Sequence, residues 1–258
     1  MAEYTATLVE KKEINEGLGI FKFKLSQNME FKPGQWLTLA HNENNKRILR
    51  PYSIASSPSE VPQIELFVKL INKDGKPGAF TAQLFKAEKN QTYEVVKIGG
   101  IFILDENDSR KKILIGSGTG LAPYISMIRN YIEKHPKGNF IVIHGVSYEN
   151  DLAYKDELKK YEKENKIIKY IPTISRPDEN PNWKGEVGRV EDLIKTRLKK
   201  ILGEKLDPKK HVFYLCGHPN MIETIEEFLK SLGFKDKEDI KFEKYWSTPK
   251  LKLDIKNQ

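Results

Sequence analysis

The sequence predicts a two-domain protein, an antiparallel β-barrel followed by a doubly wound α/β domain with a parallel sheet. From residue 3 to about residue 100, apolar and polar residues alternate, which is typical of short strands with one buried face. From residue 111 onward, apolar runs alternate with segments of helical periodicity, which favours parallel strands joined by right-handed crossovers. We therefore expect domains at 1–107 and 108–258, joined within the polar stretch Asp105 to Arg110.

The first half contains the signals of about six strands and one short helix. Phe21, Phe23 and Leu25 alternate with lysines, and the same period recurs from Ile64 to Leu70. Turn signals separate the strands at Glu16-Gly17, Lys32-Pro33-Gly34, Ser57-Pro58 and Asp74-Gly75. With the single helix expected over 79–86, a small antiparallel barrel fits this pattern best.

The second half is predicted to alternate between strands and helices. We expect strands over 112–115, 140–145, 167–174, 212–216 and 240–245, and helices over 123–135, 152–164, 190–202 and 219–232. The last helix has the clearest limits, because Pro219 suits its first turn and Gly233 its end. Its apolar side chains lie on one face: Met221, Ile222, Ile225, Phe228, Leu229 and Leu232.

Composition excludes several classes of protein. The 258 residues are 38% hydrophobic, which is enough for a sizeable core and excludes a wholly disordered or collagen-like chain. The single cysteine permits no internal disulfide and cannot supply the four thiolates of an iron–sulfur cluster. The start of the chain carries charges where a signal peptide is apolar, and no apolar run reaches the length of a membrane span. We expect a cytoplasmic protein without membrane insertion.

The chain is basic, with 44 Lys and Arg against 36 Asp and Glu, a net charge of +8. The lysines are spread through the sequence and alternate with glutamates, as over 159–166, so we do not expect a nucleic-acid partner. Two interpretations stay open: a solvated lysine-rich surface, or a basic face that steers an acidic protein partner.

A glycine-rich segment follows the first predicted parallel strand and leads into a helix. Gly116, Gly118 and Gly120 would let backbone amides approach an anion closely, and the helix directs its positive N-terminus to the same place. This context predicts a nucleotide-pyrophosphate site, although the spacing differs from the usual dinucleotide fingerprint. No Asp or Glu stands at the end of the next strand, around Ser147, to bind the ribose 2′-hydroxyl of NAD.

The third predicted parallel strand ends in Ser175 and Arg176, and Arg189 precedes the next helix. One hydroxyl and two guanidiniums suit the 2′-phosphate of NADP, because each can form a charge-assisted hydrogen bond. The alternative is that both arginines are ordinary exposed residues of a basic protein.

Five short motifs in register resemble those of the ferredoxin–NADP reductase family, most closely its bacterial branch, from about residue 5 to 246. They are Arg50-Pro51-Tyr52-Ser53, Gly118-Thr119-Gly120-Leu121-Ala122-Pro123, Ser175-Arg176, Cys216-Gly217 and Glu243-Lys244-Tyr245-Trp246. The resemblance implies that the barrel binds FAD and the sheet domain binds NADP(H). His144 and His218 lack metal-ligand spacing, so we expect no metal site and structural roles for both.

For FAD, the resemblance implies that Arg50 binds the pyrophosphate, that Tyr52 stacks on the flavin beside Pro51, and that the Ser53 hydroxyl approaches N5. Backbone groups of Phe67, Val68 and Lys69 would line the ribityl and phosphate region, and Ala79, Phe80 and Thr81 would offer helix N-terminal amides to the second phosphate.

For the nucleotide, it implies that Gly118, Thr119 and Gly120 hold the pyrophosphate and that Ser147, Ser175, Arg176 and Arg189 surround the adenosine phosphate. Many bacterial relatives have another arginine at the position of Ser147. Cys216 would position the nicotinamide without covalent chemistry, with Gly217 and Asn220 beside it.

At the C-terminus, Tyr245 would cover the flavin face that nicotinamide must occupy and so act as a gate. Trp246 would stack on the flavin or its adenine, and Glu243 is a candidate proton-relay group. The segment 247–258 extends past the usual end of the family. It is either a disordered tail or a cover for the adenine of FAD.

The predicted function is an FAD-dependent oxidoreductase of this family. It would move a hydride between NADPH and FAD, and single electrons between FAD and an acidic ferredoxin or flavodoxin. We expect a monomer. Two alternatives stay open: an NADH-linked reductase with another acceptor, and a non-catalytic flavin- or nucleotide-binding subunit of an electron-transfer complex.

Overall fold

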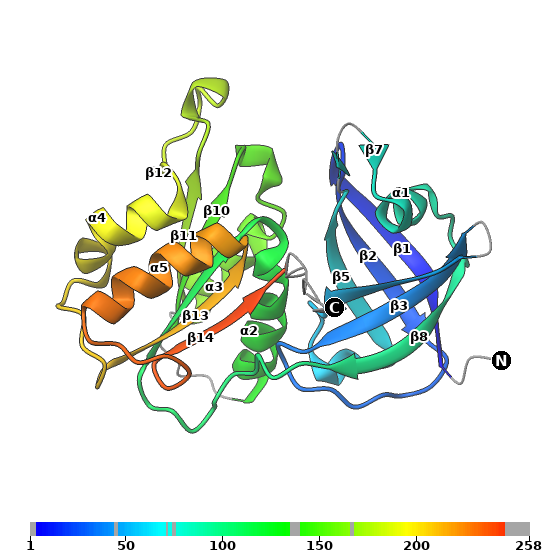
Figure 1. Cartoon of the computed structure of the whole chain (residues 1–258), viewed down its shortest axis with the longest axis horizontal. Helices are drawn as coiled ribbons and strands as arrows, with labels where there is room; N and C mark the ends of the chain where they lie inside the picture. Colours follow the sequence, from blue (N-terminus) through cyan, green and yellow to red (C-terminus); the bar gives the residue numbers. More distant parts are fainter. Residues whose placement is uncertain are drawn as a thin grey trace, which may run out of the picture.

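The computed structural model describes residues 4–43, 46–70, 72–73, 76–134, 140–165 and 168–245. Within them, an antiparallel sheet and a parallel sheet with its helices lie side by side (Figure 1). The predicted fold class is confirmed.

The first sheet has the strand order β4-β3-β8-β1-β2-β5, with every neighbouring pair antiparallel. Its strands are β1 (Thr5–Asn15), β2 (Leu18–Leu25), β3 (Trp36–Glu43), β4 (Lys46–Ser53), β5 (Gln63–Lys69) and β8 (Thr92–Gly99). A bridge between Ile54 and Leu66 brings the two edge strands together and closes the barrel. The hairpin β6 (Asn72–Lys73) and β7 (Lys76–Pro77) precedes helix α1 (Ala79–Lys86), and the 3₁₀ turn η1 (Pro58–Glu60) precedes β5.

Strand β5 departs most from the predicted single buried face. In β2 the alternation from Phe21 onward fills the barrel, since Phe21 and Phe23 are fully buried, whereas Leu18 and Ile20 pack on the other domain. In β5, by contrast, Glu65 and Phe67 are buried as well as Leu66, because the outer face of this strand packs on the other domain. The expectation of one buried face was therefore wrong for β5.

The second sheet has the order β12-β11-β10-β9-β13-β14, with all pairs parallel. Its strands are β9 (Lys111–Ser117), β10 (Phe140–Val146), β11 (Ile168–Ile174), β12 (Glu186–Val187), β13 (His211–Gly217) and β14 (Ile240–Lys244). The helices are α2 (Ala122–Lys134), α3 (Lys155–Asn165), α4 (Val190–Leu202) and α5 (Pro219–Ser231), with 3₁₀ turns η2 (Gly118–Leu121), η3 (Glu149–Asp151) and η4 (Pro177–Glu179). The helix expected from residue 152 begins at Lys155, because a turn at 153–154 separates it from η3.

Helices cover both faces of this sheet (Figure 1). Helices α4 and α5 bury alternate residues of the strands such as Ile113 and Phe213. Helices α2 and α3 bury the opposite set, including Leu114 and Tyr214, and this second core continues into the barrel. Leu18, Ile20, Ala55 and Phe67 of the barrel belong to it, so apolar packing joins the two halves.

The connection between the sheets runs from Gly99 to Lys111. Arg110 anchors its end through ion pairs with Asp108 and Asp239, at 2.8 and 2.6 Å. None of the helices in the described ranges is both long and apolar enough to span a membrane.

Candidate functional site

Two adjoining cavities lie between the domains at the carboxyl ends of the parallel strands, where open α/β sheets bind ligands. The barrel cavity, about 400 Å³, is lined by Trp36, Thr38, Arg50, Pro51, Tyr52, Ser53, Phe67, Val68, Lys69, Thr81, Thr119, Glu243, Lys244 and Tyr245. The loop cavity, about 350 Å³, is lined mainly by the glycine turn and the ends of β10, β11 and β13. Lys69, Thr119 and Tyr245 line both cavities.

Strand β4 supplies polar and aromatic groups to the barrel cavity. Arg50 is exposed, and its Nη1 donates to the Leu49 carbonyl at 2.8 Å. Among the described residues, no carboxylate pairs with its guanidinium. The Tyr52 hydroxyl is buried without a hydrogen-bond partner in the described part of the chain, and burial raises its pKa. The Tyr52 hydroxyl can donate a hydrogen bond to a ligand, and the Arg50 guanidinium can bind an anion. Together they are the donors expected of a site for an anionic, hydroxyl-bearing ligand.

Helix α1 begins beside this cavity. The Thr81 side chain lines the cavity and donates to the Gly78 carbonyl at 3.1 Å. The ring of Phe80, in contrast, packs in the barrel core against Tyr52 and Tyr93, with centroids 5.9 and 6.0 Å away. Only the backbone of Phe80 therefore stands at the helix N-terminus, where amides are available to an anion.

Ser53 connects the two domains through hydrogen bonds. The Tyr245 hydroxyl lies 3.0 Å from Ser53 Oγ and 3.0 Å from the Thr119 carbonyl, and Ser53 Oγ donates to Glu243 Oε2 at 3.3 Å. Burial raises the pKa of Glu243 to about 7, against the opposing effect of the Ser53 hydrogen bond. Near neutral pH this carboxyl can therefore hold or release a proton.

Cys216 lies beneath these groups and is fully buried. Burial, together with the nearby Glu243, raises the pKa of its thiol well above the ordinary value, so it stays protonated. It does not line either cavity, whereas the following residue, Gly217, lines the loop cavity. This environment suits packing and excludes a thiolate nucleophile.

The glycine turn needs its glycines for two different reasons. Gly118 has a φ of +54°, a left-handed conformation that disfavours side chains. Gly120 faces the end of β13, where a Cβ would lie 2.3 Å from the Cys216 carbonyl oxygen. Gly217 combines both demands, with a φ of +130° and a Cβ position 2.4 Å from Ser117 Oγ. The turn and the end of β13 thus meet backbone to backbone at the loop cavity.

His144 supports the glycine turn from β10, which is a structural role of the kind expected for it, although its partner was not predicted. Its side chain is fully buried, with Nε2 2.9 Å from the Gly118 carbonyl and Nδ1 3.3 Å from the Tyr170 hydroxyl. Burial lowers its pKa to about 4, so the ring is neutral and donates from Nε2 to Gly118. His218 caps α5 instead, since its Nδ1 accepts from the Asn220 amide at 3.2 Å.

The residues predicted to surround the adenosine phosphate do not all converge. Ser147, Ser175 and Arg189 line the loop cavity, as do Gly118, Thr119, Gly217 and Asn220. Arg176 does not line it. Its guanidinium lies over the Tyr148 ring at 5.4 Å and pairs with Glu179 at 3.0 Å.

Sequence reasoning also missed residues of the barrel cavity. Trp36 lines it, and a Cβ at Gly99 or Gly100 would lie 3.3 or 3.0 Å from the Trp36 ring. The adjacent glycines were the one signal that a bulky group packs there. Trp246 and the segment 247–258 lie outside the described residues.

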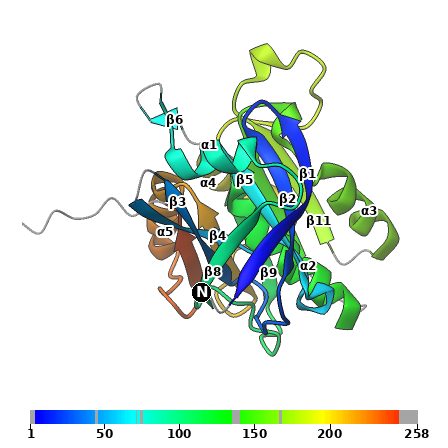
Figure 2. The same ribbon diagram turned by 90° about the vertical axis from the view of Figure 1, so that its right-hand side faces the viewer.

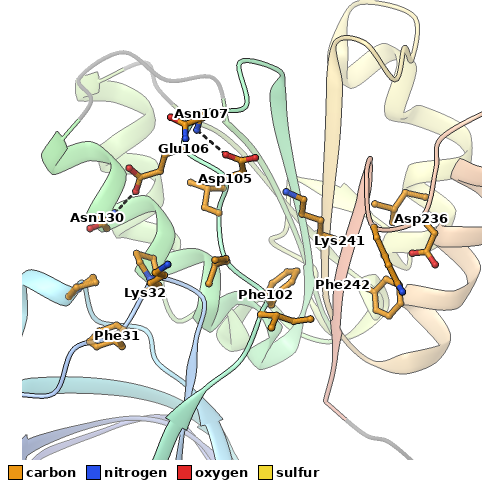
Figure 3. Close-up of a pocket in the computed structure, with 17 residues that line it drawn as sticks. Phe31, Lys32, Phe102, Asp105, Glu106, Asn107, Asn130, Asp236, Lys241 and Phe242 are labelled. Atoms are coloured by element: carbon orange, nitrogen blue, oxygen red, sulfur yellow. Dashed lines mark hydrogen bonds between the residues drawn. The ribbon is translucent and has the colours of Figure 1, made fainter.

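A larger groove, about 850 Å³, lies between the connection 101–107 and β14 (Figure 3). Two of its three acidic side chains are engaged locally, since Glu106 Oε1 accepts from Asn130 at 3.0 Å and Asp105 Oδ1 from the Asn107 amide at 3.0 Å. The glycine turn and Ser53 do not border it, so the candidate site is placed in the two smaller cavities.

Comparison with known proteins finds a separate family model for each half of the chain. The family model of the oxidoreductase FAD-binding domain matches residues 5–100, and that of the oxidoreductase NAD-binding domain matches residues 114–227. The chain is 29% identical over 200 residues to ferredoxin–NADP reductase B of Sorangium cellulosum, covering 78% of this chain and 79% of that protein. It is 30% identical over 225 residues to a flavodoxin/ferredoxin–NADP reductase of Buchnera aphidicola subsp. Schizaphis graminum, covering 81% and 84%.

The same fold occurs in the crystal structure of a ferredoxin NADP⁺ reductase from Neisseria gonorrhoeae with bound FAD and NADP. The TM-score is 0.82 at 23% identity, over 95% of this chain and all of that one. The sequence relatives and the two matched domains lead to one conclusion: the chain belongs to the ferredoxin (flavodoxin)–NADP reductase family of oxidoreductases.

Proposed function

We propose that this chain moves a hydride between NADPH and FAD, and single electrons between FAD and an acidic ferredoxin or flavodoxin. One observation carries the proposal: the barrel cavity and the loop cavity meet at Tyr245 and Thr119. Two ligands that fill these cavities would come together at that boundary. A flavin accepts electrons in pairs and releases them singly, which is the chemistry such a pair of cavities would serve.

The residues of the barrel cavity fit FAD. Arg50 would bind the pyrophosphate, and the amides at the start of α1 would take part in the same contact. Tyr52 would stack on the flavin, and its orphan hydroxyl would gain a partner from the cofactor. Lys69, at the end of β5, borders both cavities and would face phosphate groups.

Ser53 and Glu243 would manage a proton at the flavin edge. Ser53 Oγ lies between the Tyr245 hydroxyl and the Glu243 carboxylate, so a proton can pass from the site to Glu243 through one hydroxyl. The pKa of Glu243, about 7, suits a group that both accepts and returns a proton near neutral pH.

Tyr245 would act as a gate between the cavities. Its hydroxyl lies 3.0 Å from both Ser53 Oγ in the barrel and the Thr119 carbonyl oxygen in the glycine turn, and it donates to one of them at a time. These contacts hold the ring at the boundary, and the ring has to move before nicotinamide can reach the flavin. Cys216, buried behind it, would position the nicotinamide by packing.

The choice of NADPH rests on the rim of the loop cavity. Arg189, with 73% of its side chain exposed, and the hydroxyls of Ser147 and Ser175 surround a position suited to a 2′-phosphate. The orientation of Arg176 away from this cavity favours the second candidate, an NADH-linked reductase with another acceptor.

Titration with NADPH and NADH separates the two candidates. We expect NADPH to reduce the FAD-loaded protein at lower concentration, and Arg189→Gln to weaken that preference about tenfold or more by removing a charge-assisted contact. Arg176→Gln is the matched control, with a smaller expected effect. Equal reduction of the unmodified protein by NADH would overturn the NADPH assignment.

The carrier would dock beside β14, on the groove shown in Figure 3. Phe242 and Ile101 expose 36% and 96% of their surface there, and Lys32 and Lys237 are exposed beside them. Phe242 is followed directly by Glu243 of the barrel cavity, so a carrier on this groove would be close to the flavin. The monomeric state and the cytoplasmic location belong to the same proposal.

A further inference from the structure

Arg129 occupies a particular place between the domains. It belongs to α2, the helix that follows the glycine turn, and its helix packs on the barrel through an apolar core (Figures 1 and 2). Only 16% of its side chain is exposed. A guanidinium withdrawn from water needs several partners, and their positions decide what this residue does.

Its partners come from both domains. On the barrel side, Nη1 lies 3.1 Å from Glu65 Oε1, 3.7 Å from Glu60 and 3.4 Å from the Ala55 carbonyl. On its own side, Nε and Nη2 donate to the two carboxylate oxygens of Glu157 in α3, at 2.7 and 2.9 Å. One planar group therefore joins α2, α3 and the barrel.

Neighbouring hydrogen bonds strengthen the same junction. Ser126, one helical turn earlier, donates to the Ser56 carbonyl at 2.7 Å. Tyr154 donates its hydroxyl to Glu65 Oε1 at 2.9 Å, and Ser56 Oγ accepts from the Glu65 amide at 3.1 Å. These bonds are buried, so solvent does not compete with them.

The barrel atoms held in this way adjoin the barrel cavity along the chain. Ala55 comes two residues after Ser53, and Glu65 comes two residues before Phe67. Ser53 and Phe67 both line the barrel cavity. At the other end of α2, the preceding turn lines the loop cavity through Gly118 and Thr119. Arg129 thus connects the elements that carry the two cavities.

We propose that Arg129 is a positioning residue, which fixes the orientation of the two domains and thereby the approach of nicotinamide to flavin. The inference rests on the proposed function. A fixed domain orientation requires a rigid contact. The planar guanidinium of Arg129 provides one, because its several N–H donors meet carboxylates in one plane. Hydride transfer is sensitive to such control, since a displacement of about 1 Å can lower its rate about a hundredfold.

Arg110 provides a matched control. It has similar exposure, at 19%, and forms ion pairs with two carboxylates, but Asp108, Asp239 and the other partners all lie within residues 108–239. Arg110→Gln removes a comparable network without touching the barrel. Arg129→Lys keeps the charge and loses the fork, and Glu65→Gln tests the same junction from the barrel side.

Domain orientation can be measured without cofactor by spin-label distances. Cys216 is the only cysteine of the chain and is fully buried, so labels can be attached to cysteines introduced at the exposed residues Lys89 and Lys199. We expect Arg129→Gln to broaden or displace the distance distribution between the labels, and Arg110→Gln, which loosens the anchor of the connection but no contact with the barrel, to change it less. Identical distributions for Arg129→Gln, Glu65→Gln and the unmodified protein would overturn the proposal.

Rapid mixing of the FAD-loaded protein with saturating NADPH gives the second readout. We expect Arg129→Gln to lower the limiting rate of flavin bleaching about tenfold or more, with Arg129→Lys intermediate. Binding of 2′,5′-ADP, which on the proposed function would contact the loop cavity alone, should change less than about twofold. An unchanged limiting rate would contradict the inference. A protein that NADPH does not bleach at all would defeat the proposed function, while the label distances would still test the orientation.

Discussion

Two opposing influences act on the Glu243 carboxyl. Burial favours its neutral form and raises its pKa to about 7, while the hydrogen bond from Ser53 favours the ionised form. The folded chain thus keeps a proton on Glu243 to higher pH than the unfolded chain, in which the pKa of a glutamate lies near 4.5. Protein stability is therefore lost as pH rises between these two values.

Replacing Glu243 by glutamine removes this dependence. The unmodified apoprotein loses unfolding free energy as the pH rises from about 5 to about 8, because Glu243 has to ionise while buried. Glu243→Gln does not pay this cost, so over the same pH range we expect it to gain about 1 to 2 kcal/mol of unfolding free energy relative to the unmodified apoprotein, allowing for solvent screening. Urea unfolding at both pH values measures the gain, with the exposed Glu88→Gln as control. A difference between Glu243→Gln and the unmodified protein that does not vary with pH would rule out the raised pKa.

The glycines of the turn should tolerate alanine unequally. Gly120→Ala places a methyl group 2.3 Å from the Cys216 carbonyl oxygen, where backbone must move, so we expect a loss of about 1 to 3 kcal/mol and weaker nucleotide binding. Gly118→Ala meets no atom within 4 Å and strains only its φ of +54°. Thermal unfolding of both variants compares these costs, and equal losses would contradict the close approach of turn and strand.

Sequence motifs identified many of the groups that the cavities bring together, because such groups recur at fixed positions relative to strands. Ser53 is about 190 residues away from Glu243 and Tyr245 in the chain and meets both through hydrogen bonds. A structural role was expected for His144, but its contact with Gly118 was not predicted, because it depends on the register of β9 and β10, which no local pattern reveals. The direction of Arg176 depends on a stacking partner, Tyr148, that spacing cannot predict.

At the scale of elements, the glycine turn η2 depends on β10 for its shape. His144 donates to the Gly118 carbonyl and accepts from Tyr170, and burial keeps the ring neutral. The turn is therefore held by a side chain that never reaches the cavity itself, since His144 is fully buried.

Replacing that ring should weaken the turn selectively. We expect His144→Phe, which keeps an aromatic ring without the donor, to reduce NADP⁺ affinity about fivefold through the loss of one buried hydrogen bond. FAD binding should stay unchanged. Tyr170→Phe leaves the Gly118 contact intact and should have a smaller effect. Isothermal titration measures NADP⁺ and FAD affinity in the unmodified protein and in both variants. Unchanged NADP⁺ affinity in His144→Phe would show that the turn does not need the hydrogen bond from His144.

The limits of α5 followed from local signals, because Pro219 stands in its first turn and Gly233, in a left-handed conformation, lies just past its end. The burial pattern of strand β5 could not be predicted from local signals, because Glu65 and Phe67 are buried by contact with the other domain. Periodicity reports the packing of an element within its own layer and carries no information about a second partner.

At the scale of the whole molecule, the net charge of +8 predicts attraction for an acidic carrier. We expect electron transfer to such a carrier to slow as salt is raised, since screening shortens the reach of the attraction. Two single substitutions reverse a charge at the groove, Lys32→Glu and Lys237→Glu. Each should slow carrier reduction at low salt by about tenfold.

Lys195→Glu on α4 is the control for this prediction, because it changes the net charge on an exposed residue away from the groove. Stopped-flow rates over a salt series separate the outcomes. Equal effects of all three substitutions would mean that overall charge, and not the groove, steers the carrier. Rates independent of salt would remove steering altogether.

The account depends above all on two ligands meeting at Tyr245 between the barrel and the sheet domain. The most direct measurement is anaerobic titration of the purified, FAD-reconstituted protein with NADPH, followed by flavin absorbance. We expect stoichiometric FAD, released on denaturation, whose absorbance bleaches when NADPH is added. A chain that cannot be reconstituted with FAD, or whose bound FAD is reduced by neither NADPH nor NADH, would contradict it.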